Sequence, residues 1–515
     1  MHRCLDVPDI LLEIIGHLLP PNDLEYSING AAEPCPIVDA KAWQGAVALA
    51  RVARSFMNPA LDALWRVLPS PAHLLNCLVL SNTVSDCTSV LTCISSDQVY
   101  KNPPADDMWT RFYFYAPRIK NLWVNDDVAV AEFIFHQLSE RRRAGPLLPN
   151  LKHLVWNIHD EAQRQRIFSC FSLFSSPSLE HLSINPSYLE NGSVPPLSTA
   201  FPSLRELTVM LKTNDTYDNV HTEKLKPQVS ELLLTSPPLT VLSVAVNLTA
   251  EALAHVSMMP QLQELDMLVS ELDTRSIVSL ASENSLFPAL HTIDISDINL
   301  WASIGLFESF RERRDIERIS VNCPNSWAPE GIMGHFCFVV SEHCSVDMLR
   351  DFDLSLNEFA EDFLDDQDPS EFPIYGIQEL EPLFSFHRME YFNFSYWKVD
   401  LDNSFLEAMP SSWPCLRHAH FWSVSKSLGL QEHAPRMTVD GLIHLAKHCP
   451  HLSYLHLDLA LPSCWAAYGS FKRDWDHAQQ ISLPSLLLAI RLPTHHWDSS
   501  ITRFLLEIFP NGQHD

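Results

Sequence analysis

A short phrase of apolar residues recurs along this 515-residue chain. It reads apolar-x-x-apolar-x-apolar, often with a proline two places before the first apolar position, as in residues 149–156, 177–184, 202–209 and 450–457. This repetition constrains the fold strongly, because each copy can bury its apolar side chains only against neighbouring copies. The first apolar position falls at Ile119, Leu151, Leu179, Leu204, Leu239, Leu262, Leu290, Ile316, Leu349, Met389, Leu416 and Leu452, with a weaker copy at Leu486.

Each copy predicts one short strand followed by a helix. Alternate residues of a strand point to opposite sides, so the second and third apolar residues are expected to face the core together. Helix-like stretches lie between copies, at residues 250–256 and 440–449. The proline that follows such a stretch ends the helix, because it cannot continue the helical hydrogen-bond ladder.

The spacing and one local motif point to a known repeat class. The copies recur every 31 residues, roughly, near the upper edge of the leucine-rich-repeat period. In residues 440–459, Cys449 and Pro450 directly precede Leu-x-x-Leu-x-Leu. This stretch resembles the cysteine-containing leucine-rich repeats of many ubiquitin-ligase adaptors. The resemblance implies an α/β solenoid over residues 67–515, an irregular leucine-rich-repeat horseshoe; the alternative is chance recurrence in an ordinary α/β protein.

Residues 1–66 lack the phrase and have the pattern of helices. Apolar residues recur three to four apart over residues 10–19, which predicts a first helix. A second predicted helix covers residues 47–56, and a third, shorter one covers residues 61–65. Between the first two, residues 20–41 form a polar stretch with four prolines, which is expected to loop out. We expect a small helical module ahead of the repeats.

The module resembles an F-box. Residues 7–15 match the opening pattern of that family, and residues 49–56 and 61–66 match its closing pattern. Valine at position 7 stands where leucine is usual. With the repeats that follow, the chain is similar to the F-box proteins of mushroom-forming fungi. The resemblance implies docking to a Skp-type adaptor, and through it to a cullin in a cullin-RING ubiquitin ligase, while the solenoid binds a protein substrate. It assigns adaptor contact to Val7, Pro8, Ile10, Leu11, Ile14, Leu49, Val52, Leu64 and Trp65. Alternatively, some of these, especially Leu49 and Val52, fill the core of the module.

Strand alternation also predicts the face that a partner would meet. The residues flanking the second and third apolar positions are expected to line a concave surface. Of 36 such positions, seven are acidic and one, Arg318, is basic. The C-terminal end of this face carries tyrosine, tryptophan and histidine, and aromatic residues are favoured anchors in interfaces.

We expect a basic or polar substrate segment to follow the middle strands and to anchor on this aromatic end. The alternative is that the partner binds a loop and that these are solvated strand residues. The candidate substrate-binding residues are Asp351, Asp353, Tyr391, His418, His420, Trp422, Tyr454, His456 and Asp458.

Charge and missing motifs narrow the function further. The formal net charge of −28 disfavours nucleic acid and anionic membranes as partners. No signal peptide or membrane-spanning window is readable, so a cytoplasmic or nuclear protein is expected. Phosphate-binding loops, nucleophile elbows and zinc-protease motifs are missing from the sequence, which predicts neither catalytic residues nor a cofactor. The histidines and cysteines of residues 335–344 fit no zinc signature and are expected to pack in the core. The second functional hypothesis is a leucine-rich-repeat scaffold that does not engage a ubiquitin ligase.

Overall fold

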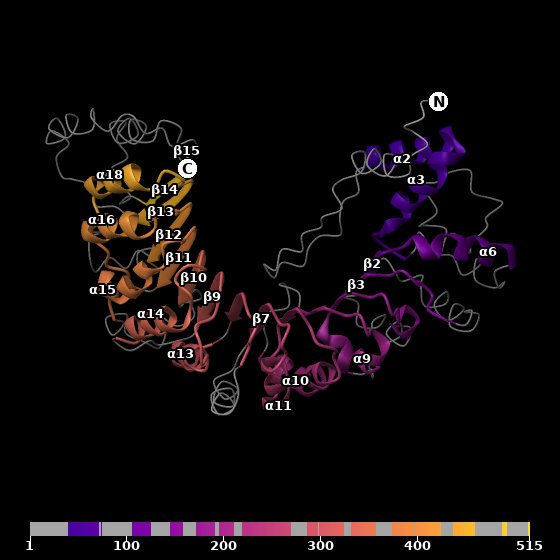
Figure 1. The fold of residues 1–515 in the computed structure, drawn as a ribbon, viewed down its shortest axis with the longest axis horizontal. Coiled ribbons are helices and arrows are strands. Elements are labelled where there is room, and N and C mark those ends of the chain that lie inside the picture. Colours follow the sequence, from indigo (N-terminus) through magenta and orange to yellow (C-terminus); the bar gives the residue numbers. More distant parts are fainter. Residues whose placement is uncertain are drawn as a thin grey trace. The chain divides into compact units, whose positions relative to one another are not determined.

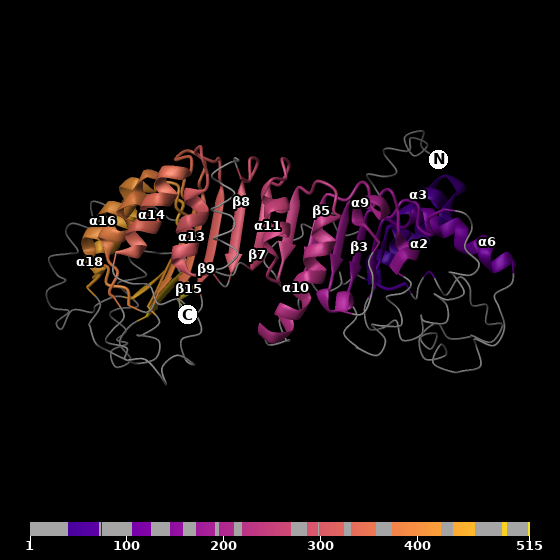
Figure 2. The same ribbon diagram turned by 90° about the horizontal axis from the view of Figure 1, so that it is seen from below.

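The computed structural model forms two compact units, Met1–Ala252 and Leu253–Asp515, which we call unit 1 and unit 2. Within each unit the strands lie side by side and run parallel (Figure 1, Figure 2). The parallel α/β architecture predicted from the repeated phrase is therefore confirmed. The structure describes residues 40–71, 74, 106–124, 145–157, 171–190, 195–210, 219–268, 286–296, 298–323, 331–356, 373–396, 398–423, 436–458, 487–491 and 513–514.

In unit 1 the strands pair in the order in which they occur along the chain. They are β1 (Val67–Leu68), β2 (Asn121–Val124), β3 (His153–Trp156), β4 (His181–Ile184), β5 (Glu206–Val209) and β6 (Val241–Val244). The helices are α2 (Ala40–Val52), α3 (Arg54–Arg66), α6 (Asp106–Tyr115), η3 (Ala116–Arg118), η5 (Phe171–Phe174), η6 (Pro186–Glu190), α9 (Leu197–Ala200) and α10 (Asn219–Leu234). The boundary with unit 2 falls inside α11 (Ala250–Ser257).

Unit 2 has the same organisation, and its longer helices stack along one side of the strands (Figure 1). The strands are β7 (Glu264–Leu268), β8 (Thr292–Ser296), β9 (Arg318–Cys323), β10 (Asp351–Leu356), β11 (Tyr391–Tyr396), β12 (His418–Ser423), β13 (Tyr454–Asp458), β14 (Leu487–Arg491) and β15 (Gln513–His514). The helices are α13 (Leu300–Glu308), α14 (Ile332–His343), α15 (Ile377–Leu380), η8 (Glu381–Ser385), α16 (Asn403–Ser412) and α18 (Val439–His448). The helices predicted at residues 250–256 and 440–449 correspond to α11 and α18.

Burial along the strands follows the predicted alternation. In β3, β4 and β5 the second and third apolar residues of the phrase are buried, and the residues between and beside them are half-buried. The copies that begin at Ile316 and Leu349 form β9 and β10 with the same alternation. Strands β2 and β11 depart from it, since nearly all their residues are buried on both faces. In β11 this encloses the polar side chains of Asn393 and Ser395.

The weak copy near the C-terminus was predicted one residue out of phase. A first position at Leu486 would place Arg491 third, among the core residues. Instead, β14 pairs Leu488 with Leu455 and Ile490 with Leu457, so the second and third apolar positions are Leu488 and Ile490. A one-residue shift in register turns every side chain to the opposite face, and only the observed register puts two aliphatic residues in line with the core.

One backbone carbonyl before each strand ties neighbouring repeats together. The Lys120 carbonyl accepts from the amides of Lys152, at 2.7 Å, and His153, at 2.9 Å. The Glu390 carbonyl does the same for Arg417, at 2.7 Å, and His418, at 3.0 Å. The same pair of hydrogen bonds to one carbonyl recurs through both units. We call this series of carbonyls the carbonyl ladder. It satisfies two backbone donors at the point where the chain enters each strand.

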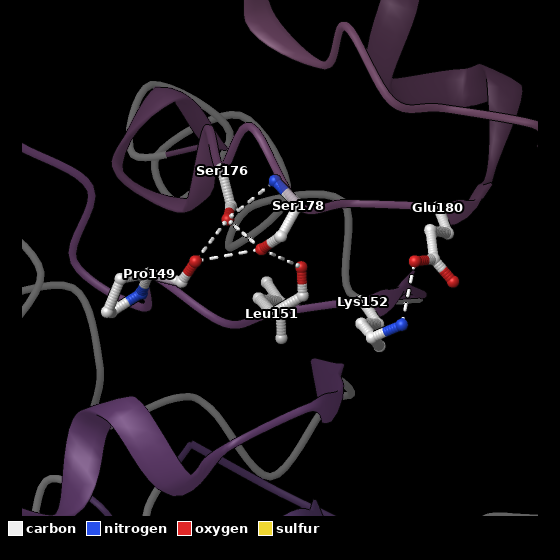
Figure 3. Close-up of polar contacts among 6 residues, drawn as sticks. All are labelled: Pro149, Leu151, Lys152, Ser176, Ser178 and Glu180. Carbon is white, nitrogen blue, oxygen red and sulfur yellow. Dashed lines mark hydrogen bonds and ion pairs between the residues drawn. The ribbon is translucent and has the colours of Figure 1, made fainter.

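Side chains reinforce the ladder at the entry to β4 (Figure 3). The Ser178 hydroxyl lies 2.8 Å from the carbonyl of Pro149 and 3.0 Å from that of Leu151, one repeat earlier. Beside it, the Lys152 ammonium donates to the Glu180 carboxylate at 2.7 Å. The residues around the phrase therefore connect each repeat to the previous one as well as starting a strand.

Candidate functional site

The first surface of interest is formed by α2 and α3, which pack against each other and directly precede β1. The predicted helix over residues 47–56 is wrong at its C-terminal end, because Ala53 has an extended backbone between the two helices. Phe56 therefore belongs to α3, where its amide donates to the Ala53 carbonyl at 3.1 Å. Phe56, Ala60 and Leu64 recur every four residues, which places them on one buried face of α3.

The predicted adaptor-binding residues fall into different environments. Val52 is 67% exposed at the end of α2, and Leu49 is half-buried. Leu64 is buried on α3, and the Trp65 ring stacks on Tyr115 at 4.2 Å between centroids. The remaining five, Val7, Pro8, Ile10, Leu11 and Ile14, lie outside the described residues, as do residues 20–39 of the predicted loop.

A second contact attaches α3 to the start of the repeats. The Arg118 guanidinium in η3 forms an ion pair with Asp62 of α3. It also donates to the Asn58 side-chain oxygen at 3.0 Å. Together with the stacked Trp65 and Tyr115 rings, these contacts pack the helical module onto the first repeat, so Trp65 already has a role inside unit 1.

The second surface lies on the strands of unit 2, where parallel pairing aligns the predicted substrate-binding residues. Asp351, Tyr391, His418 and Tyr454 occupy one line across β10 to β13, which we call the first row. The Tyr391 and Tyr454 rings each lie 6.1 Å from the His418 ring. Burial raises the pKa of Tyr391 to about 12, and the nearby aspartates add to this shift.

Arg318, the basic residue of the predicted face, is paired with this row. Its Nε and Nη2 atoms donate to Asp351 Oδ2 at 2.9 and 2.7 Å. Two such bonds from one guanidinium are stronger than a single neutral hydrogen bond. The charges of Arg318 and Asp351 therefore largely compensate each other at this end of the row.

Two residues further along the strands, Asp353, Asn393, His420 and His456 form the central row. The Asn393 amide donates from Nδ2 to Asp353 Oδ1 at 2.8 Å. Its oxygen Oδ1 lies 2.6 Å from His420 Nδ1. Because the amide nitrogen faces the carboxylate, Oδ1 is the acceptor and His420 Nδ1 carries the proton. These three residues form one hydrogen-bond chain across three strands.

Aromatic rings surround the end of this chain. The Trp422 ring lies 5.9 Å from His420 and meets His456 edge-on at 5.1 Å. The His456 and Tyr454 rings lie 4.5 and 6.4 Å from His420. Burial, together with the neighbouring His456, lowers the pKa of His420 to about 4, so its ring is neutral near pH 7. We call His420, Trp422, Tyr454 and His456 the aromatic patch.

The structure thus brings eight of the nine predicted substrate-binding residues onto adjacent strands. For the ninth, Asp458, the backbone lies in β13 opposite Arg491 of β14, and its side chain is not described. Sequence reasoning placed Asn393 on the face but did not select it. Its position in register between Asp353 and His420 is the signal that marks it, and this signal requires knowing which strands are neighbours.

The central row continues from Asp353 through Ser320 of β9 to Asp294 of β8. Asp266 of β7 lies directly opposite Asp294. Burial, followed by the charge of Asp266, raises the pKa of Asp294 to about 6. Like charges opposite each other on neighbouring strands are destabilising. A cation bound at this end of the face would therefore reduce the repulsion between the Asp266 and Asp294 carboxylates.

The prediction that the histidines and cysteines of residues 335–344 pack in the core is confirmed for the two cysteines and wrong for His335, which is exposed on α14 with Nε2 3.7 Å from the Glu308 carboxylate. Cys337 and Cys344 are fully buried, and burial raises the pKa of both thiols. His343 Nδ1 lies 2.9 Å from the Phe310 carbonyl. Among the described residues, no three histidine, cysteine or acidic side chains are grouped to hold a metal ion. Nor does the described part of the chain include a helix long and apolar enough to span a membrane.

Comparison with known proteins gives no assignment: the chain matches no protein-family model, and no curated protein matches it in sequence.

Proposed function

We propose that this chain is a substrate-recognition adaptor of a cullin-RING ubiquitin ligase. In this proposal the N-terminal helices form an F-box that docks a Skp-type adaptor, and the strands and helices form a leucine-rich-repeat solenoid that binds a protein substrate. The chain has no catalytic step of its own and needs no cofactor.

The observation that carries the proposal is the apolar surface left exposed on α2 and α3. Val47, Val52 and Met57 are all exposed, although Phe56 and Leu64 of the same helix pair are buried. Contiguous exposed apolar patches mark protein-interaction sites, and the proposal takes these three residues to belong to one such patch. The module also lies immediately before a parallel array, the order that the resemblance to F-box proteins implies.

A specific observation favours the second candidate, a repeat scaffold whose helices serve as an end cap. Leu64 is buried in the module and Trp65 packs on Tyr115 of α6, so two of the nine predicted adaptor contacts have packing roles within unit 1. In that case the exposure of Val47 and Val52 would have no role in binding an adaptor. The two functions differ in one property, binding of a Skp-type adaptor.

Titrating the purified full chain with a purified Skp-type adaptor distinguishes them. We expect binding in wild type and at least about tenfold weaker binding for Val52→Asp, because a charge would be buried in an apolar contact. Met258→Asp is the matched control, since Met258 is also exposed and lies outside the module. Pro8→Ala combined with Ile10→Asp is expected to abolish binding. A wild-type chain that fails to bind, or a Val52→Asp chain that binds normally, would favour the scaffold.

A further inference from the structure

We propose that the aromatic patch of unit 2 binds a single arginine side chain of the substrate, with His420 Nε2 as the hydrogen-bond acceptor for its guanidinium. This inference rests on the proposed function, because it takes the strand face to be the substrate-binding surface. It adds the chemical class of residue that the substrate presents there.

The first step is the tautomer of His420. Asp353 can only accept, so it holds the amide nitrogen of Asn393, and the amide oxygen then accepts from His420 Nδ1. A neutral imidazole protonated on Nδ1 has a lone pair on Nε2. Among the described residues, Nε2 of His420 has no hydrogen-bond partner, and the ring is only half-buried. The patch therefore presents an acceptor and requires a donor from its ligand.

The second step is the surroundings of that acceptor. Trp422, Tyr454 and His456 place aromatic rings within 6.4 Å of the His420 ring centroid. Aromatic faces attract cations, and the attraction strengthens when the cation loses water. All four residues of the aromatic patch are half-buried, so a cation bound among their rings would lose part of its water. Arginine suits such a place better than lysine, because its planar guanidinium stacks on rings and is more weakly hydrated.

The third step is charge. The hydrogen-bond chain ends on the carboxylate of Asp353, and further along the same line Asp266 and Asp294 stand opposite each other. Arg318, the basic residue among the predicted face positions, is already paired with Asp351. A negative ligand such as a phosphorylated or acidic side chain would meet the carboxylates of Asp353, Asp294 and Asp266 along this line. A positive ligand is favoured along the row, and its strongest single anchor is at the patch.

The test uses the full chain and labelled nonapeptide pools with one fixed central residue: arginine, lysine or citrulline. The flanking positions carry a random mixture of uncharged residues. Citrulline keeps the shape of arginine and removes the charge, so it isolates the cation. We expect the arginine pool to be retained about tenfold more than the citrulline pool, in line with a cation–π contact in a partly dehydrated site.

Two variants locate the binding. Trp422→Ala should reduce the arginine preference at least about fivefold, and Trp301→Ala, which removes a 58% exposed tryptophan from α13, should leave it unchanged. His420→Phe keeps a ring and removes the acceptor, so it tests the proposal even if Trp422→Ala fails to fold. Equal retention of all pools, a lysine preference, or an arginine preference that survives both patch variants would overturn the inference.

Adaptor binding is measured on the same preparations, so that the two proposals fail separately. Loss of adaptor binding with the arginine preference intact removes the ligase function and keeps the site. An intact adaptor interaction with no arginine preference removes the site and keeps the ligase function.

Discussion

Both units carry two histidines that lie opposite each other on neighbouring strands, and the two pairs are used differently. In unit 1, His153 of β3 stacks on His181 of β4 at 3.8 Å between centroids and 11° between planes, and His181 Nδ1 contacts the Glu206 carboxylate of β5. In unit 2, His420 of β12 is held through Asn393, and its neighbour His456 lies tilted at 4.5 Å beside Trp422.

The difference shows that residue type and direct cross-strand pairing do not by themselves determine a role. In unit 1 the histidine ladder ends on a carboxylate of the protein itself, which supplies the countercharge that a ligand could otherwise bring. In unit 2 an amide separates the carboxylate of Asp353 from His420, and burial keeps the imidazole neutral. Three aromatic rings lie within 6.4 Å of the His420 ring centroid. The first arrangement is a structural ladder, and the second has the features of a recognition site.

The largest expected effect comes from disturbing the packing between helices α16 and α18 of unit 2. Gly441 of α18 packs against α16, where a Cβ would clash with Leu406 Cδ1 and lie 2.9 Å from Asn403 Oδ1. We expect Gly441→Ala to lower the free energy of unfolding by about 1–3 kcal/mol, the usual cost of overpacking. Urea unfolding of the full chain measures this. Gly334→Ala in α14 is the control, because its Cβ would meet nothing closer than 3.6 Å, and it should be neutral or stabilising by up to about 1 kcal/mol.

A decrease in pH should lower the free energy of unfolding by an intermediate amount. Variants of His153 and His420 separate the contributions of the two histidine pairs. Burial lowers the pKa of both His153 and His420 to about 4, whereas the pKa of histidine in an unfolded chain is about 6.5. The unfolded state therefore binds more protons between these values, so stability present above pH 6.5 is lost as the pH falls towards 4. His153→Phe and His420→Phe should each flatten this decline by about 1 kcal/mol, after allowance for partial exposure.

Urea titrations between pH 7 and 5 check the slope rather than the absolute stability. Of these two variants, only His420→Phe should also lose the preference for arginine peptides. If His153→Phe lost that preference too, the division between a structural and a recognition histidine would be wrong.

The smallest effect concerns the ion pairs beside the carbonyl ladder, which should be equivalent in the two units. The hydrogen bond from Lys152 lowers the pKa of Glu180, so its contribution is present at neutral pH and is lost as the carboxylate is protonated in acid. Glu180→Gln should cost less than about 1 kcal/mol, since exposed ion pairs contribute little. Glu390→Gln, which breaks the 3.0 Å pair with Arg417 in unit 2, should cost a similar amount. A large cost in one unit alone would show that the pair does more than join repeats.

Sequence alone predicted most of the strands, because each begins two residues after the first apolar position of its phrase, as His153 follows Leu151 and Tyr391 follows Met389. The phrase works because the core residues are local and periodic. The two-residue strands β1 and β15 were missed, since they are too short to show alternation. The helix break at Ala53 was missed as well, because no proline or glycine marks it.

The candidate site was predicted as a set of positions but not as a hydrogen-bonded arrangement. Alternation is sufficient to place Tyr391, His418 and Trp422 on one face. It cannot show that Asn393 orients His420, since that depends on the register between β11 and β12, whose residues are 27 positions apart in the sequence. The pairing of Arg318 with Asp351 is non-local for the same reason.

The carbonyl ladder has a consequence for how such a chain can vary. Because the ladder and the strand that follows it set the phase of each repeat, the length of the connection to the next strand is not constrained by them. The segment between β10 and β11 is longer than the one between β4 and β5. In both cases the next strand pairs in register with the previous one. Insertions and deletions on the connecting side would therefore leave the order of side chains across the strands intact. Side chains on the proposed substrate-binding face can therefore change independently of the length of the connecting segments.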